Sequence, residues 1–443
     1  MFPHFFWGAG ALCWDLSGGA KGGLAVAWMY RSGQTWIRSN AAYKRQFVTD
    51  AGAVPMGAAG ADVTISTAAD LLAALNGVDV LIDETYSSSL YTWDKFLEDY
   101  QLQGVATLPK VVQERKVFRL DGLVSGTGSS DWFAGAVAEA DEVLRDVIGA
   151  VQGTLGTRGT WLRRLYDGVP AVETSGSCSN ALAPAVLRDG TIALPAMANG
   201  VSLDFFPAKV SVLYAQQFTI TYAGTYKTLE NKNSNGNEKY LLYQRGTQPP
   251  ADTSGYKVFA VPLQGVAVED TSVLRFLELL GVQATVRYMQ TQYATSGCLQ
   301  SLAQRSAIGP LASSSSAAVR QAQLAAVDAL FTWSGSAEPK SIAMSATADP
   351  GSLQRAEWIK FVAAFFNKEA EAQRIFEAVR QQYLFEAQAT LGVATRPVVA
   401  RPRFGWAASC FHNLLHACYV LAVVRRLKVF THLRCLLLFL LDS

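Results

Sequence analysis

Residues 355–383 read RAEWIKFVAAFFNKEAEAQRIFEAVRQQY. Apolar side chains recur in this segment at steps of three and four residues, which is typical of one face of an amphipathic helix: Trp358, Val362, Phe365, Phe366, Ala372, Ile375, Phe376, Val379 and Tyr383. Asp349 and Pro350 supply an N-cap with proline at the first helical position, and Gly392 supplies a C-terminal stop. The pattern predicts one helix over 349–392, about 40 residues and roughly 60 Å long. A helix broken near Asn367 is the alternative.

Strand and helix patterns alternate before this helix. Buried or half-buried strands are predicted at 24–28, 78–83 and 116–122, and helices at 40–52, 67–75, 92–100 and 131–151. Farther along, alternating side chains on either side of an Asn-Gly turn (232–237) predict a β-hairpin, and 327–333 and 340–346 are predicted strands. This order predicts an α/β protein with mainly parallel sheets, in which the long helix joins one lobe to the first strand of another.

The composition predicts a globular protein with two or three domains. The chain has 443 residues, of which 50% are apolar and 17% charged, and its net charge is +2. An average soluble domain has about 25% charged residues, so this chain is comparatively apolar. It contains no basic stripe with interleaved aromatic residues, and we therefore expect no nucleic-acid partner.

Two sequence segments resemble segments of a known protein family. VPLQGVAVEDTSVLRFLELLGV (261–282) resembles the opening of the N-terminal lobe of the class III solute-binding proteins, and LPKVVQERKVFRLDGLVSGTGSSDWFAGAVAEADEVLRDVIGAV (108–151) resembles the end of their C-terminal lobe. This family captures iron-siderophores, haem and cobalamin for ABC importers. The resemblance implies two Rossmann-like lobes joined through one long interlobe helix, a metal-chelate ligand and a possible ABC-type permease as partner.

The lobes stand in reversed order relative to that family. We divide the chain into an N-terminal extension (1–23), a lobe resembling the family's C-terminal lobe (24–151), a linker (152–204), a lobe resembling its N-terminal lobe (205–348), the helix (349–392), and a strand remnant with a hydrophobic basic tail (393–443). RPVVA (396–400) resembles LAVAW (24–28), as if a second lobe began there. A trimmed tandem array and a circular permutation both explain this order.

Candidate binding residues follow the predicted strands, because ligands in open α/β sheets lie beyond the carboxyl ends of the strands. In the first lobe they are Tyr30, Trp36, Glu84, Tyr86, Ser125, Thr127, Asp131 and Trp132, and in the second lobe Asp270, Thr271, Ser272, Thr295, Ser296 and Trp333. Aromatic rings with a few polar groups suit a bulky, partly apolar ligand such as a metal chelate. We expect a non-enzymatic solute-binding protein, with an interaction or scaffold protein that retains the fold as the alternative.

No catalytic or metal-binding residue is predicted. All four histidines lie in the terminal segments, so no Ser-His-Asp or Cys-His arrangement is expected in the folded part: His4, His412, His416 and His432. The spacing of Cys410, His412, His416 and Cys418 is not that of a closed zinc site. We therefore expect no enzyme, no resident cofactor and no metal ligands.

The six cysteines and the two chain ends bear on the compartment. Cys178 and Cys298 would form a disulfide in a secreted protein, and would be buried thiols in a reducing compartment.

The first 19 residues have no basic region and no clear cleavage site, so we predict no signal peptide, although the resemblance favours an extracytoplasmic location. The apolar runs of the tail are interrupted by basic residues and are shorter than the ~18 residues of a membrane span. The tail is expected to lie on a membrane surface or to have no folded role.

Overall fold

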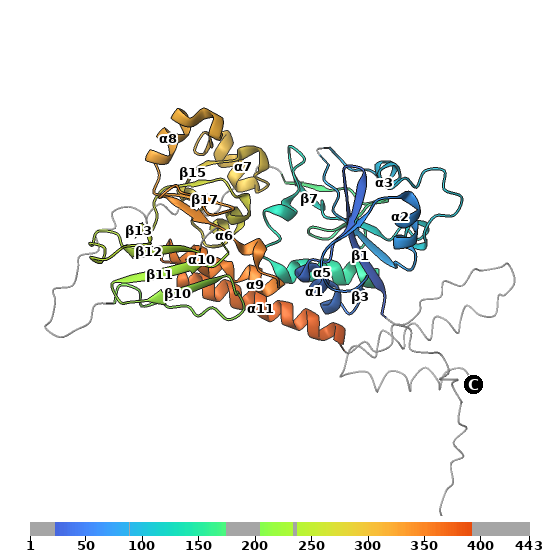
Figure 1. Cartoon of the computed structure of the whole chain (residues 1–443), viewed down its shortest axis with the longest axis horizontal. Helices are drawn as coiled ribbons and strands as arrows, with labels where there is room; N and C mark the ends of the chain where they lie inside the picture. Colours follow the sequence, from blue (N-terminus) through green and yellow to red (C-terminus); the bar gives the residue numbers. More distant parts are fainter. Residues whose placement is uncertain (1–22, 88, 174–203, 234–236, 392–443) are drawn as a thin grey trace, which may run out of the picture. The chain divides into compact units, whose positions relative to one another are not determined.

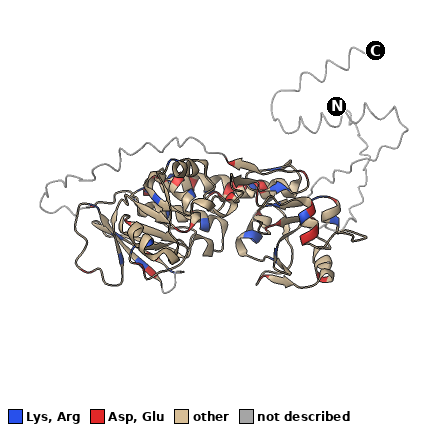
Figure 2. Ribbon diagram, turned by 90° about the horizontal axis from the view of Figure 1, so that it is seen from above, with Lys and Arg blue, Asp and Glu red and all other residues tan. Residues whose placement is uncertain are grey.

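The computed structural model describes residues 23–87, 89–173, 204–233 and 237–391 (Figure 1). The chain divides into two compact units, 1–393 and 394–443, and the second lies outside the described residues. The first unit is an α/β protein, as predicted, and its sheets are partly mixed and partly parallel. Acidic and basic residues are interspersed along its helices and strands (Figure 2).

The first sheet has seven strands in the order β4-β2-β1-β5-β6-β8, with β3 paired to β1. Its strands are β1 (Ala25–Ser32), β2 (Thr35–Arg38), β3 (Val54–Pro55), β4 (Val63–Ile65), β5 (Val80–Asp83), β6 (Val117–Arg119) and β8 (Arg163–Arg164). The central strands β1, β5 and β6 run parallel, and every residue of β5 and β6 is buried. Continuous apolar runs of this kind are typical of strands covered on both faces. The strands predicted at 24–28, 78–83 and 116–122 are confirmed.

The helices of this part are α1 (Ala42–Asp50), α2 (Ala68–Leu75), α3 (Trp93–Asp99), α4 (Lys110–Gln113), η1 (Asp131–Phe133) and α5 (Ala140–Gln152). Thr67 and Thr92 cap α2 and α3, since each hydroxyl accepts a backbone N–H three residues later. The helix predicted at 131–151 is shorter than expected. Asp131 starts a tight turn, in which the Gly135 N–H donates to its carbonyl oxygen (2.7 Å), and α5 begins at Ala140.

Residues 152–173 belong to the predicted linker and supply two strands. Besides β8, they contain β9 (Ala171–Glu173), which pairs in parallel with β7 (Leu123–Ser125) to form a two-stranded sheet. Residues 174–203, the rest of that linker, lie outside the described part of the chain. The two-stranded sheet matters for the site because β7 and β9 border it.

The next part of the chain contains two sheets. The four-stranded sheet has the order β10-β11-β12-β13: β10 (Phe218–Tyr222), β11 (Tyr226–Asn231), β12 (Glu238–Gln244) and β13 (Lys257–Val261). The predicted hairpin is confirmed, because β11 and β12 pair antiparallel. The five-stranded sheet is β16-β15-β14-β17-β18: β14 (Val266–Val268), β15 (Val286–Met289), β16 (Gly309–Pro310), β17 (Ala329–Thr332) and β18 (Ser341–Ala343).

All neighbours in the five-stranded sheet run parallel. Two runs of strands grow outward from β14, so a crevice is expected at the carboxyl ends of β14 and its neighbours. The helices that accompany this sheet are η3 (Thr271–Val273), α6 (Leu274–Leu279), η4 (Gln283–Thr285), η5 (Thr291–Tyr293), α7 (Gly297–Gln304), η6 (Ser314–Ser316), α8 (Ala317–Ala325) and η7 (Ala346–Ala348).

The single helix predicted over 349–392 is wrong. The segment forms α9 (Ser352–Ala356), α10 (Trp358–Ala364) and α11 (Glu369–Leu391, 23 residues), so the alternative of a break near Asn367 is correct. Asn367 has a left-handed backbone (φ 54°), which asparagine tolerates better than most residues. Its amide group donates to Gln244 (3.0 Å) and its carbonyl oxygen accepts from Lys227 (2.9 Å), and these contacts stabilise the break.

The two helices on either side of the break have different surroundings. Every residue of α10 is buried, and the rings of Phe218 and Tyr240 pack against Phe361. Helix α11 packs against α10, α5 and α1 (Figure 1), and its Tyr383 hydroxyl donates to Asp50 (2.6 Å). One hydrophobic core therefore extends from the first sheet through α5, α11 and α10 to the five-stranded sheet.

Candidate ligand-binding site

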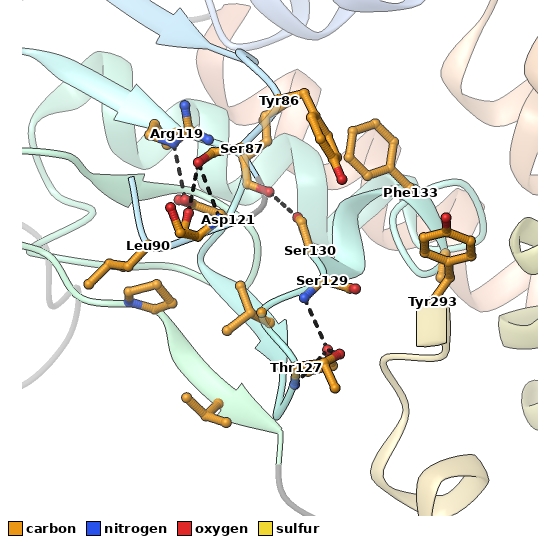
Figure 3. A pocket seen from close by; sticks show the side chains of 18 of the residues that line it. Tyr86, Ser87, Leu90, Arg119, Asp121, Thr127, Ser129, Ser130, Phe133 and Tyr293 are labelled. Carbon is orange, nitrogen blue, oxygen red and sulfur yellow. Dashed lines mark hydrogen bonds and ion pairs between the residues drawn. The ribbon is translucent and has the colours of Figure 1, made fainter. Parts of the chain in front are cut away.

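A cavity of about 780 Å³ lies at the carboxyl ends of β5, β6 and β7 (Figure 3). Asp83, Arg119 and Ser125, the last residues of these three strands, line it. Residues from the second half of the unit also reach it: Thr271 begins η3 after β14, and Tyr293 ends η5 after β15. The cavity therefore combines loops that follow parallel strands in both parts of the unit, where ligands bind in open α/β sheets.

A buried ionic network forms the floor of the cavity. Arg119 donates to Asp83 and, through Nε, to Asp121 (3.0 Å), while Arg163 makes two bonds to Asp121 (2.6 and 3.0 Å). The side chains of Asp83, Arg119 and Arg163 are 0%, 6% and 2% exposed. Tyr100 adds a hydrogen bond to Asp83 (2.8 Å). Buried charges require partners of this kind, and the network keeps the floor rigid.

Two tyrosines next to the network stay protonated. Burial raises the pKa of Tyr100, and the negative charge of Asp83 raises it further. Burial and Asp83 act in the same way on the pKa of Tyr91, whose hydroxyl donates to Asp99 (2.9 Å) and whose ring lies 3.9 Å from the Arg119 guanidinium. Both phenols therefore act as hydrogen-bond donors at physiological pH.

The loop at 125–130 forms one wall and is closed by its own hydrogen bonds. The hydroxyl of Ser125 accepts the backbone N–H groups of Thr127 (3.3 Å) and Ser129 (3.0 Å), and Gly128 has the left-handed φ of 87° that such a turn requires. The Ser129 hydroxyl donates to the carbonyl oxygen of Gln292 (3.1 Å) and so links this wall to η5.

Apolar side chains surround the cavity at the surface. Tyr86 is 77% exposed, Phe133 56% and Tyr293 55%, and all three rings lie on the same side of the view in Figure 3. Leu90 and Val169 also line the cavity and are exposed. Large apolar side chains that gather at a cavity mark a surface that a ligand can cover.

The structure brings five of the predicted site residues to this cavity: Glu84, Tyr86, Ser125, Thr127 and Thr271. Asp131, Thr295 and Ser296 line a neighbouring cavity of about 400 Å³, where Thr295 donates to Asp131. Trp132 lines a third cavity of about 280 Å³, which shares Glu84 with the first.

The other predicted site residues lie outside these three cavities. Trp36 is buried in the core, with its indole N–H on the carbonyl oxygen of Asp99 (3.0 Å), and Tyr30 is half-buried in β1. Asp270 caps η3 by accepting the N–H of Ser272, which is itself buried. Trp333 is 74% exposed after β17.

Sequence reasoning missed Arg119, Asp121, Phe133 and Val169. A signal for the first two was present, because the predicted strand VFRLDG places two charged residues among apolar ones, and charged residues are seldom buried without a partner. Phe133 and Val169 had no comparable signal, since single exposed apolar residues are normal on protein surfaces.

Further observations concern disulfides, metals and membranes. Cys298 is disulfide-bonded, whereas Cys178 lies outside the described residues, so the pairing of these two stays a prediction. The residues that the structure describes contain no cluster of His, Cys, Asp and Glu that could hold a metal ion. Within the same residues no helix has the length and apolar character to cross a membrane. The tail at 393–443 and the N-terminal 22 residues lie outside them.

Comparison of the chain with family models, with curated proteins and with solved structures finds no match.

Proposed function

We propose that this chain is a non-enzymatic solute-binding protein that holds a bulky, partly apolar small molecule in the cavity of about 780 Å³. The observation that carries the proposal is the composition of this cavity: a rigid buried ionic floor, walls of hydroxyl groups and exposed aromatic rings. Ligand sites combine an apolar surface with a few fixed polar groups in this way.

The position of the cavity supports the same function. It lies at the carboxyl ends of parallel strands, and loops after β14 and β15 complete it. The proposal treats the parts that carry the seven-stranded and five-stranded sheets as two Rossmann-like lobes around one ligand, as in the class III solute-binding proteins that the sequence resembles. A metal chelate of the siderophore, haem or cobalamin type is the ligand class that this resemblance implies, and an ABC-type permease is the partner.

The disulfide at Cys298 supports an extracytoplasmic location for this function, since disulfides persist mainly in oxidising compartments. The buried ion pairs support binding rather than catalysis: Asp83, Arg119 and Asp121 hold one another, and Lys44 holds Glu84. A general base needs a titratable group that can exchange its proton with a substrate, and these carboxylates are occupied by cations.

The test is unfolding of the full chain, followed by calorimetry or fluorescence, with ferric siderophores, haem and cobalamin as ligands. A ligand present at 100 times its dissociation constant should stabilise the folded state by about 2.7 kcal/mol. Phe133→Ala should weaken binding about tenfold, because it removes an aromatic contact surface from the cavity. The matched control is Phe385→Ala, a change at a phenylalanine that is 66% exposed in α11 and does not line the cavity.

Stabilisation that Phe133→Ala reduces and Phe385→Ala leaves intact would support the proposal. A cooperative unfolding transition that none of these ligands shifts would count against it and would favour a scaffold that retains the fold. Equal ligand-induced stabilisation in the two variants would mean that the ligand binds away from Phe133.

A further inference from the structure

The charges around the cavity restrict the ligand that it can hold. Among the described residues that line it, the charged side chains are Asp83, Glu84, Asp121 and a single cation, Arg119. An anionic ligand needs a cation with free hydrogen-bonding capacity, and such ligands are usually held by arginine in a bidentate geometry. The charge of the ligand therefore depends on whether the guanidinium of Arg119 is free to bind an anion.

Each of the three guanidinium nitrogens of Arg119 already has a hydrogen-bond partner. Its Nε donates to Asp121 (3.0 Å), one Nη donates to Asp83 and the other to the carbonyl oxygen of Thr85 (2.9 Å). One face of the guanidinium lies on the ring of Tyr91, 3.9 Å from its centre, and the side chain is 6% exposed. Turning Arg119 toward an anion would leave two buried carboxylates short of a partner, which is costly.

Arg163 and Lys44, which bind carboxylates of the lining, also have their own hydrogen-bond partners. Arg163 makes two bonds to Asp121 and donates to the carbonyl oxygens of Gly168 (3.0 Å) and Tyr91 (2.7 Å). Lys44 is paired with Glu84 and also donates to the Ser39 hydroxyl (3.3 Å). Neither of them is among the residues that line the cavity.

Backbone N–H groups are the other usual partners of anions, and four of them in the loop at 125–130 are occupied. The N–H groups of Thr127 and Ser129 donate to the Ser125 hydroxyl. The N–H of Gly128 donates to the Ser125 carbonyl oxygen (2.9 Å), and that of Ser125 donates to the Ser129 carbonyl oxygen (2.8 Å). These four N–H groups of the sequence SGTGSS are therefore not available to a phosphate.

Three serine hydroxyl groups of the lining present acceptors to the cavity. Ser87, Ser129 and Ser130 donate their hydroxyl hydrogens to the carbonyl oxygens of Ser89 (2.8 Å), Gln292 (3.1 Å) and Leu120 (2.5 Å). A serine hydroxyl that donates internally keeps only lone pairs for a ligand. The exposed rings of Tyr86, Phe133 and Tyr293 add π faces, which attract cations.

We infer that the ligand of this cavity is uncharged or positively charged and presents N–H or O–H donors, and that anionic ligands are excluded. This inference rests on the proposed function and narrows it. Among metal chelates it selects neutral and cationic complexes over polyanionic ones. The uncharged donors left in the lining, such as the Tyr86 and Tyr293 phenols, do not compensate for a missing cation.

The experiment compares three ferric chelates by calorimetry on the full chain. They are a trihydroxamate with one free ammonium group, the same trihydroxamate acetylated at that amine, and a tris-catecholate trianion. The two hydroxamates should bind at least roughly tenfold more tightly than the trianion, because the described lining offers acceptors and its one cation, Arg119, is paired. Acetylation removes the positive charge of the amine and leaves the metal centre unchanged. The two hydroxamates therefore differ in charge at the same metal centre.

Two variants at an exposed lining residue provide the matched pair. Thr127→Lys places a cation at the cavity without altering the buried ionic network, and Thr127→Gln adds comparable bulk without charge. Thr127→Lys should weaken the ammonium chelate roughly tenfold relative to Thr127→Gln and should strengthen binding of the trianion.

Wild-type binding of the trianion as tight as that of the ammonium chelate would overturn the inference and leave the proposed function standing. Equal affinities of Thr127→Lys and Thr127→Gln for the ammonium chelate would overturn it too. Absence of binding by all three chelates would overturn the proposed function, and the inference with it.

Discussion

Substitution of Lys227 by methionine tests how the break between α10 and α11 is stabilised. Lys227 lies in β11, its side chain is 0% exposed, and it is paired with Glu369, the first residue of α11, whose side chain is 3% exposed. Burial lowers the pKa of Lys227 to about 8 and raises that of Glu369, since both charges have left water. Lys227 also donates to Asn367 (2.9 Å) and lies 4.5 Å from the ring of Phe206.

The expected loss follows from these contacts. Removal of one partner of a buried ion pair costs about 3–5 kcal/mol, because the other charge stays buried alone. The lost hydrogen bond to Asn367 adds about 1 kcal/mol, so Lys227→Met should lower the free energy of unfolding by about 4–6 kcal/mol. With a urea dependence of about 3 kcal/mol per M, the unfolding midpoint should fall by roughly 1.3–2 M.

Two further variants test whether the loss of stability comes from an unpaired buried charge. Lys227→Met combined with Glu369→Gln should recover more than half of the loss, because no unpaired charge remains. Arg374→Met breaks the exposed Arg374–Glu371 pair of the same helix and should cause no resolvable change. A single variant within 1 kcal/mol of the wild type, or a double variant as unstable as the single one, would show that this ion pair does not stabilise the break.

Three other predictions concern the backbone, pH and the site. Asn367→Ala should lower the free energy of unfolding by about 1 kcal/mol more than Asn367→Gly, since only alanine has a strained left-handed φ; denaturant unfolding of both variants measures this difference. Burial raises the pKa of Asp141 to about 6, so the folded protein binds more protons than the unfolded chain between about pH 4 and 6, and stability falls as pH rises through this window. Asp141→Asn should therefore stabilise the protein by about 1–2 kcal/mol above pH 6 and have no effect below pH 4, and unfolding at several pH values would contradict this if the gain were constant. Tyr86→Ala should weaken ligand binding about tenfold with little change in the unfolding midpoint, because its ring is 77% exposed, and a large midpoint shift would show that the ring has a structural role.

The strands and helices were largely predictable because their signals are local. The run VLID predicts a strand buried on both faces, and β5 is fully buried. Thr67, the first residue of TAADLLAAL, marks the start of α2, where its hydroxyl accepts the N–H of Asp70. The position of five predicted residues at one cavity follows from a general rule, because loops at the carboxyl ends of parallel strands meet at one edge of a sheet.

The sequence by itself determined that the chain is an α/β protein, because periodicity, caps and turn residues act over a few neighbours. Only the tertiary structure decided where the C-terminal helix breaks and what the cavity floor contains. Asn367 adopts its left-handed backbone beside Lys227 and Gln244, which precede it by 140 and 123 residues. Arg119 is held by Asp83, 36 residues earlier. The free energy of such contacts depends on burial and on groups far apart in the chain, and no local pattern encodes it.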